Sequence, residues 1–480
     1  MATKIKHVVV LMLENRSFDH MLGYLKTDQY PINGLTGHET NPVNLEPGAK
    51  EIGVQPDATD ILVHDPGHEF SDVNVQVFEN PLGPPPVEQP NRGFVFNYGQ
   101  QPHVTPEIAP QIMSCFSAAN LPVLSALAQE FAICDHWYSS MPGPTWPNRF
   151  FAHCATSKGG ITNGGAANYD MPTVFEQLTA KGRTWKIYFH DFVHALQLTR
   201  LNSPENVVNF VKFSTFAQDA RKGRLPNYSF IEPRYYNGLA AANDQHPPHG
   251  VARGEALIAS VYKALQASNT WPESLLVIVY DEHGGTYDHV TPPAATPPDE
   301  HTSQFGFDRY GVRVPAVLVS PLIPKGTIVS QPLDHTSIIA SLRENFDLDG
   351  PLTHRDRDAS SFMGALDLAT ARTPTQQVES ALRANSPVPP PAKRLKALAA
   401  ERYLVSSTLS ELQRAMVDAT RRITGAAPTP LRAGKPIVAV DSERAAGQYV
   451  ELAIDAYLAR QRVQGRPVPT KRRSRRPIGS

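Results

Sequence analysis

Two apolar runs, far apart in the chain, each stop at a pair of polar residues that includes a carboxylate. The first run covers residues 7–13 and ends at Glu14–Asn15, and the second covers residues 275–280 and ends at Asp281–Glu282. A short run of this β-branched character predicts a buried parallel strand. In open α/β sheets, ligands bind beyond the carboxyl ends of the strands. The two runs therefore predict strands that deliver hard oxygen ligands to one point, as in a metal-dependent hydrolase.

The second tract continues into Gly284–Gly285. A glycine pair gives up side-chain packing and backbone entropy, so it predicts close approach of the main chain to another group. Carboxylates also cap strands and start helices where no site exists, and either tract alone would be a weak signal. The presence of both favours the functional interpretation.

Four further apolar runs also end near polar groups, and helical patterns separate several of them. These runs cover residues 131–134, 184–189, 228–231 and 314–320. Helical spacing is present at residues 120–131, 255–265 and 336–346, with Asn120 as the expected N-cap of the first helix. The alternation predicts a three-layer α/β domain with a mostly parallel central sheet.

Composition along the chain divides it into two parts. Residues 1–375 carry the strand and helix alternation, and within them residues 30–115 form a loop-rich segment expected to cover the top of the sheet. Residues 376–480 form a helical appendage with a basic tail, and a Pro-rich stretch at 386–391 reads as a linker. Because the appendage contains no candidate ligand cluster, we expect the site to form without residues beyond about 390.

The basic tail has no acidic residue after Asp455. Its cations are Arg460, Arg462, Arg466, Lys471, Arg472, Arg473, Arg475 and Arg476. A solvated tail is one interpretation of such a run. A patch that makes transient contact with anionic membrane lipids is the other.

Bulk properties exclude several classes of protein. The formal net charge is −1, so no overall electrostatic argument exists for nucleic acid as a partner. The three cysteines are an odd and sparse set, which argues against a disulfide framework and fits a reducing compartment. No apolar run approaches the ~20 residues of a membrane-spanning helix, and no signal-peptide cleavage site is visible. These features predict a cytoplasmic location, with non-classical export or membrane-peripheral association as alternatives.

Thr145 follows a rigid Pro-Gly-Pro turn and precedes a helix expected to begin near Pro147. A hydroxyl at a helix N-terminus lies in positive potential, which helps an alkoxide and a bound phosphate alike. A hydroxyl is a poor nucleophile until a base or a metal lowers its pKa, and the carboxylate tracts could supply that metal. Spacing alone leaves both a nucleophile and a simple cap or turn residue open.

Five blocks of the sequence resemble, in the same order, the bacterial phospholipase C and plant non-specific phospholipase C family, which has acid phosphatase relatives. The blocks are residues 14–25, 145–157, 281–293, 311–321 and 334–337. The resemblance spans about residues 5–350 and does not cover the last hundred. It implies the alkaline-phosphatase-like fold, in agreement with the three-layer architecture expected above.

The resemblance also implies roles for individual positions. Thr145 matches the family's nucleophile, which is a Thr in the phospholipases and a Ser in the acid phosphatases. The positions that match its metal and phosphate ligands are Glu14, Asn15, Asp281 and Glu282. Their oxygens fit Ca, Mg or Mn, and Zn also accepts carboxylates, so the divalent metal is not identified.

Several histidines and one arginine resemble the rest of the family's phosphate pocket. His246 is similar to a phosphate-binding histidine and possible general acid, and His190 and His68 match shorter motifs as further catalytic candidates. His283 and His289 are candidates for contact with substrate, and orientation of the ligand tract by hydrogen bonds is the alternative role. Arg149 could bind phosphate in bidentate fashion or pair with an acid.

Taken with the residues that carry it, the resemblance predicts a metal-dependent phospholipase C that forms a phosphothreonine intermediate. The expected substrate is a glycerophospholipid similar to phosphatidylcholine, and the products are diacylglycerol and a phosphorylated headgroup. A phosphomonoesterase similar to the acid phosphatases is the first alternative. A non-catalytic protein that binds lipid headgroups is the second.

Overall fold

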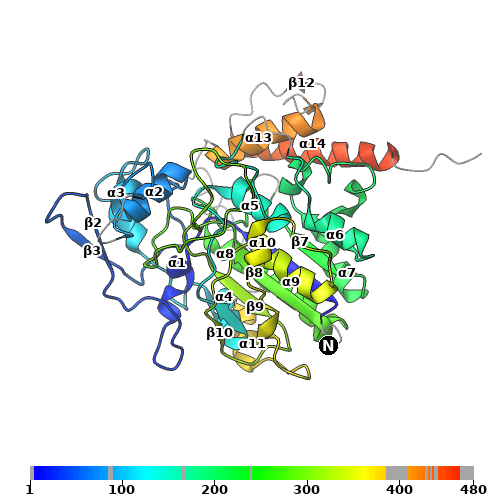
Figure 1. Ribbon diagram of the computed structural model, residues 1–480, viewed down its shortest axis with the longest axis horizontal. Helices are drawn as coiled ribbons and strands as arrows, with labels where there is room; N and C mark the ends of the chain where they lie inside the picture. The colour runs from blue at the N-terminus through cyan, green and yellow to red at the C-terminus, as the bar shows by residue number, and fades with distance from the viewer. Residues whose placement is uncertain are drawn as a thin grey trace, which may run out of the picture.

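The centre of the molecule is one eight-stranded sheet with the order β10-β4-β9-β8-β1-β7-β5-β6 (Figure 1). The computed structural model describes residues 5–84, 90–164, 169–237, 240–384, 409–426, 431–432, 435–436 and 442–464. The strands of the sheet are β1 (His7–Leu13), β4 (Ala132–Cys134), β5 (Trp185–Phe189), β6 (Phe210–Lys212), β7 (Tyr228–Ile231), β8 (Ser274–Tyr280), β9 (Ala316–Val319) and β10 (Thr327–Val329). All six strands expected from the sequence are present. The edge strands β6 and β10 were not predicted, because they are three residues long and only partly buried.

Strand directions confirm the mostly parallel sheet. Within it only β9 is reversed, running antiparallel to both β8 and β4. The central strand β1 pairs in parallel with β8 on one side and with β7 on the other. Leu13 lies opposite Tyr280, so β1 and β8 end at the same level and the polar residues that follow them become neighbours.

Two groups of helices enclose the sheet and give the expected three layers. One group is α4 (Pro122–Glu130), α7 (Phe216–Arg221), α8 (Val251–Gln266) and α11 (Gln376–Ala384). The other is α5 (Thr145–Cys154), α6 (Val174–Ala180), α9 (Thr336–Phe346) and α10 (His354–Asp358). Short 3-10 turns connect elements at Gly23–Leu25, Ala109–Met113, His194–Gln197, Val207–Asn209, Phe213–Thr215, Trp271–Glu273 and Met363–Ala365.

The start of α4 corrects one expectation. The cap position is Leu121, while Asn120 is exposed and accepts a hydrogen bond from Ser117. The carboxylate of Glu255, on α8, accepts hydrogen bonds from the backbone amides of Val123 (2.6 Å) and Leu124 (3.0 Å). The prediction of Asn120 as N-cap was therefore wrong, because a side chain from a distant helix fills that role.

The segment predicted to cover the sheet contains short elements. They are β2 (Thr40–Pro42), β3 (Glu51–Gly53), α2 (Phe70–Phe78) and α3 (Phe94–Gly99). Helix α1 (Phe18–Leu22) comes just before this segment. In Figure 1 the β2, β3, α2 and α3 part lies to one side of the sheet. It has a hydrophobic cluster of its own, distinct from the main core.

The C-terminal region contributes α13 (Glu411–Thr424), the short pair β11 (Leu431–Arg432) and β12 (Lys435–Pro436), and α14 (Glu443–Gln464). Helices α13 and α14 pack on each other, and Met416 and Ile454 are buried in the same hydrophobic cluster as the sheet. Within the predicted helical appendage, residues 385–408, which include the Pro-rich stretch, lie outside the described residues. So does the tail from residue 465, with its predicted membrane contact.

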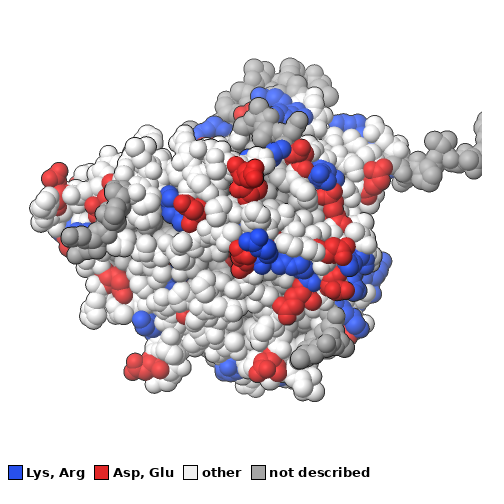
Figure 2. All heavy atoms as spheres, viewed as in Figure 1, with Lys and Arg blue, Asp and Glu red and all other residues white. Residues whose placement is uncertain are grey.

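Charges of both signs are interspersed on the face shown in Figure 2, without a broad patch of one sign. None of the described helices is long and apolar enough to cross a membrane. Cys115, Cys134 and Cys154 are buried free thiols, in agreement with the expectation that they form no disulfide framework.

Candidate active site

Three adjacent parallel strands each end at an acid, and one arginine binds all three. Glu14 follows β1, Glu232 follows β7 and Asp281 follows β8. The guanidinium of Arg149, on α5, donates to Glu14 (2.5 Å), Glu232 (2.7 Å) and Asp281 (3.1 Å). All four side chains are fully buried. Of the two roles left open for Arg149, the structure shows pairing with acids.

Thr145 lies at the centre of this group. It is the first residue of α5, which begins two residues earlier than expected. Its Oγ1 is 3.1 Å from Oε2 of Glu14 and 3.4 Å from Oδ1 of Asn15, and the side chain is fully buried. A hydroxyl hydrogen-bonded to a carboxylate and placed at the positive end of a helix has the surroundings of an activated nucleophile.

The two tracts predicted from the sequence lie against each other. Arg16 N donates to the carbonyl of Glu282 (3.0 Å) and Asn15 N donates to Oδ1 of Asp281 (3.2 Å). Gly284 has a φ of 61°, and a Cβ at this position would stand 2.1 Å from the carbonyl oxygen of Asn15. The close main-chain approach predicted from the glycine pair is therefore present.

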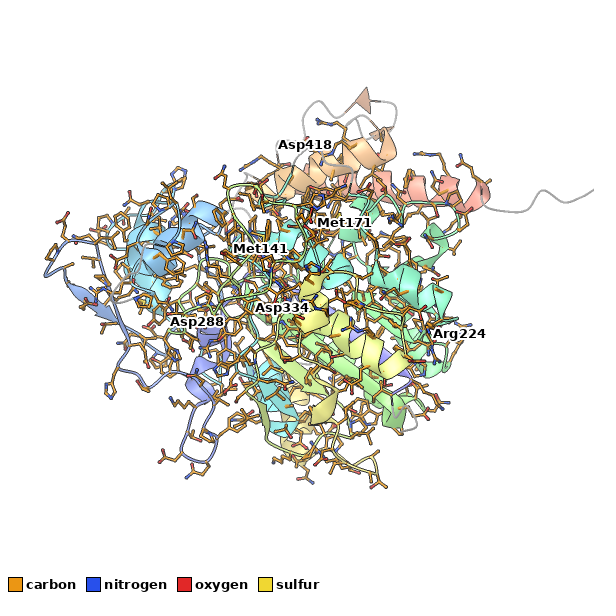
Figure 3. All side chains as sticks on the ribbon, in the orientation of Figure 1. Met141, Met171, Arg224, Asp288, Asp334 and Asp418 are labelled. Atoms are coloured by element: carbon orange, nitrogen blue, oxygen red, sulfur yellow. The ribbon has the colours of Figure 1, made fainter. Side chains whose placement is uncertain are left out.

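Figure 3 labels residues on the two sides of the sheet, which shows the direction of its parallel strands. Arg224, just before β7, lies at the amino ends of the parallel strands, whereas Asp288, after β8, lies toward the opposite side. The site is thus at the carboxyl ends of the strands, where open α/β sheets bind their ligands.

His68 and His246 face each other beside these tracts. Their ring centroids are 5.4 Å apart, and Asp65 Oδ1 is 3.8 Å from Nδ1 of each ring. Burial alone would lower the pKa of His68, but Glu282 and Asp65 outweigh it and raise that pKa to about 10. Burial and the neighbouring His68 lower the pKa of His246 well below its ordinary value. The surroundings of the two rings therefore shift their pKa values in opposite directions.

The acids of the site suit a divalent cation. Oε1 of Glu282 is buried without a hydrogen-bond partner among the described residues, which leaves an acceptor for a cation, whereas the unpartnered Nδ2 of Asn15 is a donor that fits a phosphate oxygen. Burial and the neighbouring Asp281 raise the pKa of Glu14 well above its ordinary value, and burial raises the pKa of Glu282 to about 8. Buried carboxylates that repel each other become stable in charged form when a cation lies between them. Of the predicted ligands, Glu282 therefore has an open oxygen for a hard divalent ion, and Glu14, Asn15 and Asp281 offer further oxygens that already have partners within the protein.

The structure also contains two compact ligand groups that the sequence did not single out as such. Among the described residues, ligand atoms lie within 4.8 Å of one another in Asp65–His68–His246 and in Asp19–Asp288–His289. The predicted set around Glu14 is not one of these groups, and Arg149 already binds two of its members. In the second group, the guanidinium of Arg313 forms ion pairs with Asp19 (3.0 Å) and Asp288 (2.9 Å), so the two acids already have a positive charge beside them.

None of the five predicted histidines has a hydrogen bond to Thr145 or Glu14 in the described part of the chain, and the Nδ1 atoms of His68 and His246 bond the carbonyls of Pro66 and Pro247. His289 Nδ1 donates to Asp19 (2.5 Å). His283 Nε2 donates to Gln76 (2.8 Å), and its Nδ1 is 3.4 Å from Glu282, so it is placed to orient that ligand. His190 Nδ1 donates to the carbonyl of Glu232 (2.9 Å), and its ring stacks on Phe213.

Sequence reasoning missed other members of the site. His194 lies 3.3 Å from Glu232, and Tyr235 donates to the same carboxylate (2.6 Å). Nε2 of His335 donates to the carbonyl of Asp281 (2.6 Å) while Trp137 donates to its Nδ1 (3.3 Å), which fixes the ring. Glu232 carried the same signal as Glu14, an acid at the end of a predicted strand. His194 had no such signal in the sequence, because it lies in a 3-10 turn and does not follow a strand directly.

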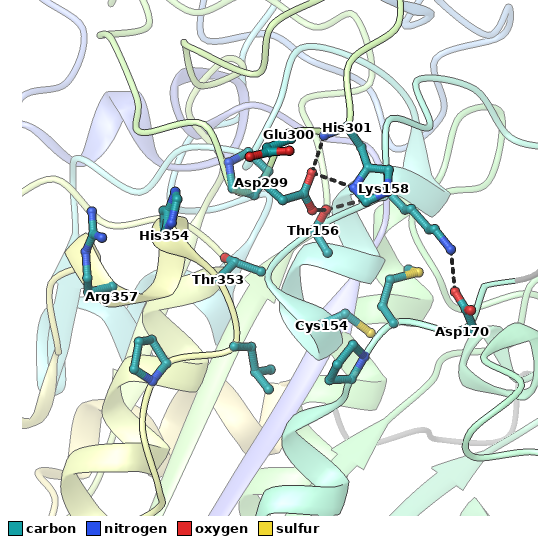
Figure 4. A pocket seen from close by; sticks show the side chains of 15 residues that line it. Cys154, Thr156, Lys158, Asp170, Asp299, Glu300, His301, Thr353, His354 and Arg357 are labelled. Carbon is teal, nitrogen blue, oxygen red and sulfur yellow. Dashed lines mark hydrogen bonds and ion pairs between the residues drawn. The ribbon is translucent and has the colours of Figure 1, made fainter.

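A cavity of about 580 Å³ opens at the other end of α5 (Figure 4). Cys154 and Thr156 line it together with Asp299 and Thr353. The ten residues of α5 rise about 1.5 Å each, which puts Thr145 roughly 14 Å away along the helix. The site itself is enclosed, and Asp65, with 27% of its side chain exposed, is the most accessible member of the group beside it.

Comparison with known proteins identifies the family of the chain. A family model described as the phosphoesterase family matches residues 5–349. Non-specific phospholipase C6 of Arabidopsis thaliana is 42% identical over 77% of this chain and 74% of its own length. Non-specific phospholipase C1 of the same plant is 39% identical over 75% and 70%. Phospholipase C B of Mycobacterium tuberculosis is 27% identical over 75% and 76%.

A mostly parallel sheet with carboxylates and a buried hydroxyl at its carboxyl ends defines the class, a hydrolase of phosphoric esters. The chain belongs to the phosphoesterase family. Among solved structures it is similar to the lipoteichoic acid synthase LtaP from Listeria monocytogenes, with a TM-score of 0.35 and 10% identity over 78% of this chain and 75% of that one.

Proposed function

We propose that the protein is a metal-dependent phospholipase C that cleaves glycerophospholipids similar to phosphatidylcholine by way of a phosphothreonine at Thr145. The observation that carries the proposal is the hydrogen bond from the buried Thr145 hydroxyl to Glu14 at the start of α5. The relatives from Arabidopsis thaliana and Mycobacterium tuberculosis are phospholipases C by name, which supports this choice of activity. Phosphatidylcholine as the substrate and the cytoplasmic location remain predictions from the sequence.

In the first step, Oγ1 of Thr145 attacks phosphorus and its proton passes to Glu14. The bond between phosphorus and the diacylglycerol oxygen breaks, and the headgroup phosphate stays on Thr145. Water then attacks the phosphothreonine and releases the phosphorylated headgroup. A divalent cation held by Glu14, Asn15, Asp281 and Glu282 would supply positive charge that lowers the pKa of the hydroxyl and offsets charge on the phosphoryl oxygens.

The leaving diacylglycerol alkoxide needs a proton. The two neighbouring histidines, His68 and His246, differ in how readily each holds a proton that it could donate. The nearby Asp65, 3.8 Å from Nδ1, favours the protonated form of His68 against the effect of burial, whereas burial favours the neutral form of His246. We assign the proton donor to His68 and a contact with the phosphoryl oxygens to His246. His190, which the resemblance matched to a catalytic role, is assigned none here, because it stacks on Phe213 and is not part of the group that Asp65 forms with His68 and His246.

The proposal is tested by assaying the purified protein on phosphatidylcholine vesicles and on an aryl phosphate monoester, each with and without chelator. A phospholipase C releases diacylglycerol from the vesicles and loses this activity when the metal is removed. Turnover of the monoester alone would establish the phosphomonoesterase instead. Binding to the vesicles with no turnover of either substrate would establish the non-catalytic protein.

A further inference from the structure

Helices α13 and α14 each begin with a glutamate that reaches back toward the site. Glu411 is the first residue of α13 and Glu443 is the first residue of α14. In Figure 1 the two helices lie above α5, the helix that carries Thr145. Both lie beyond the part of the chain matched by the family model, which ends at residue 349.

Glu443 holds one wall of the site through a histidine. Its Oε1 accepts hydrogen bonds from the backbone amide of Asn237 (2.6 Å) and from Nε2 of His249 (3.0 Å). The other ring nitrogen of His249 donates to Asp244 (2.7 Å). The imidazole therefore bridges two carboxylates and ties the segment 244–249 to the first turn of α14.

That segment is what supports the first ligand tract. The carbonyl of Asp244 accepts from the backbone amide of Glu14 (2.9 Å). The carbonyls of Gln245 (2.8 Å) and His249 (3.3 Å) accept from the buried guanidinium of Arg16. The segment also contains His246. A shift of residues 244–249 would consequently move Glu14, the hydrogen-bond acceptor of the nucleophile.

Glu411 holds the other side of the site. It accepts from Nδ2 of Asn163 (3.0 Å), and Oδ1 of Asn163 accepts from the backbone amide of Trp146 (2.8 Å). Trp146 is the residue after Thr145 in the first turn of α5. The two glutamates thus act on the two segments whose relative position sets the 3.1 Å contact between Thr145 and Glu14.

Packing of the helix pair does not require the hydrogen bonds of these two glutamates. Leu412, Met416, Val450 and Ile454 are buried in the main hydrophobic cluster and attach α13 and α14 by themselves. Glu443 is almost fully buried, and removing a carboxylate and an imidazolium from water costs free energy that apolar residues would avoid. The buried contact between Glu443 and His249 costs more free energy than apolar packing of α14 would. This indicates that the contact positions residues of the site rather than only attaching the helix.

We propose that Glu443, with Glu411 as its counterpart, is a positioning residue for the phosphoester-cleaving site. Acting through His249 and Asp244, Glu443 sets the place of Glu14 against Thr145, so the C-terminal helix pair is a working part of the enzyme. This inference rests on the proposed function of Thr145. It replaces the expectation that the site needs nothing beyond about residue 390.

The test compares Glu443→Ala and Glu443→Gln with the control Tyr457→Phe. The control removes another polar anchor of α14, the hydrogen bond from Tyr457 to Asn202, which does not touch residues 244–249. Two quantities are measured for each protein: kcat and KM on a soluble aryl phosphodiester, and the affinity for Mn²⁺ from its paramagnetic resonance signal. The melting temperature reports folding.

We expect Glu443→Ala to lower kcat about tenfold, to leave KM within about twofold and to weaken Mn²⁺ binding severalfold, since about 1.4 kcal/mol of lost positioning corresponds to a factor of ten. Glu443→Gln keeps an acceptor for Asn237 and should recover part of the loss. The control should keep the wild-type kcat and Mn²⁺ affinity even where its melting temperature falls.

Wild-type kcat and Mn²⁺ affinity in Glu443→Ala would overturn the proposal, and so would an equal loss of kcat in the control. If Glu443→Ala does not fold, Glu443→Gln is compared with the control instead. A kcat and an Mn²⁺ affinity of Glu443→Gln equal to those of the control would then overturn the proposal. An inactive wild-type protein would instead count against the proposed function. In that case the Mn²⁺ affinities still show whether Glu443 positions the ligand tract.

Discussion

The hydroxyl of Thr145 has two possible roles, and substitution separates them. If it is the nucleophile, Thr145→Ala should lower turnover by at least about a thousandfold while the metal content stays at the wild-type level. Thr145→Ser keeps the hydroxyl and loses only a methyl group that restricts χ1, so it should retain part of the activity. Rapid quench with a slow substrate and mass analysis should find a phosphoryl adduct on the peptide with Thr145.

A residue that only starts α5 would behave differently. Its loss would cost about 1 kcal/mol of stability, as for other helix-end residues, and turnover at low temperature would stay close to that of the wild type. Near-normal turnover of Thr145→Ala would therefore exclude the phosphothreonine mechanism.

Arg149 is the positive charge that the three strand-end acids share. Lysine at this position is a point charge and cannot donate to three carboxylates in the planar arrangement of a guanidinium. We expect Arg149→Lys to lower the free energy of unfolding by about 3 kcal/mol or more, the scale seen when a buried ion pair is broken. Denaturant unfolding measures the effect, and Lys158→Met, at a half-exposed ion pair, serves as the control that should change little.

At the scale of the element, the start of α4 offers a direct test of which residue caps it. Glu255→Ala removes the acceptor of two backbone amides and should lower the free energy of unfolding by about 1–2 kcal/mol. Asn120→Ala should leave the unfolding midpoint nearly unchanged, because Asn120 is exposed and does not contact the first turn. A larger effect from Asn120 than from Glu255 would contradict the structure.

Elements that depend on local sequence were predictable, and those that depend on distant partners were not. Strands β1 and β8 lie in the middle of the sheet, so both faces are buried and their apolar runs are continuous. The edge strands β6 and β10 each pair with only one neighbouring strand, are only partly buried and lack such a run. The cap of α4 comes from a residue more than a hundred positions away, which no local pattern reveals.

The same distinction explains what was predictable in the site. Glu14, Asp281 and Glu282 follow strands that meet at one edge, and their proximity follows from a parallel sheet. The pairing of Arg149 with three acids depends on how α5 lies across those strands. The sequence left its role open for that reason.

At the scale of the whole molecule, His249 makes the docking of α14 sensitive to pH. Burial would lower its pKa, but Asp244 and Glu443 outweigh burial and raise it to about 10. The folded chain therefore binds this proton more tightly than the unfolded chain does. The resulting contribution to stability, on the order of a few kcal/mol, is complete below about pH 6 and is lost as the pH rises toward 10.

The measurement is the melting temperature of the wild type and of His249→Gln at pH 6 and pH 10. The wild type should lose more stability than the variant over this range, so that the difference between them narrows at high pH. Parallel curves would show that the pKa of His249 is not raised by folding.

The position of β1 in the sheet has a consequence for how the chain acquires its structure. This strand is completed within the first thirteen residues, yet it pairs only with β7 and β8, which end at residues 231 and 280. At about 5–20 residues per second of synthesis, the apolar segment 7–13 waits on the order of tens of seconds for its neighbours. During that time it is an unpaired strand with no charged residue between His7 and Glu14, the kind of segment that aggregates or is held by chaperones. The arrangement that brings Glu14 to the middle of the site thus makes folding slow and late, because long-range pairing must come before the core can close.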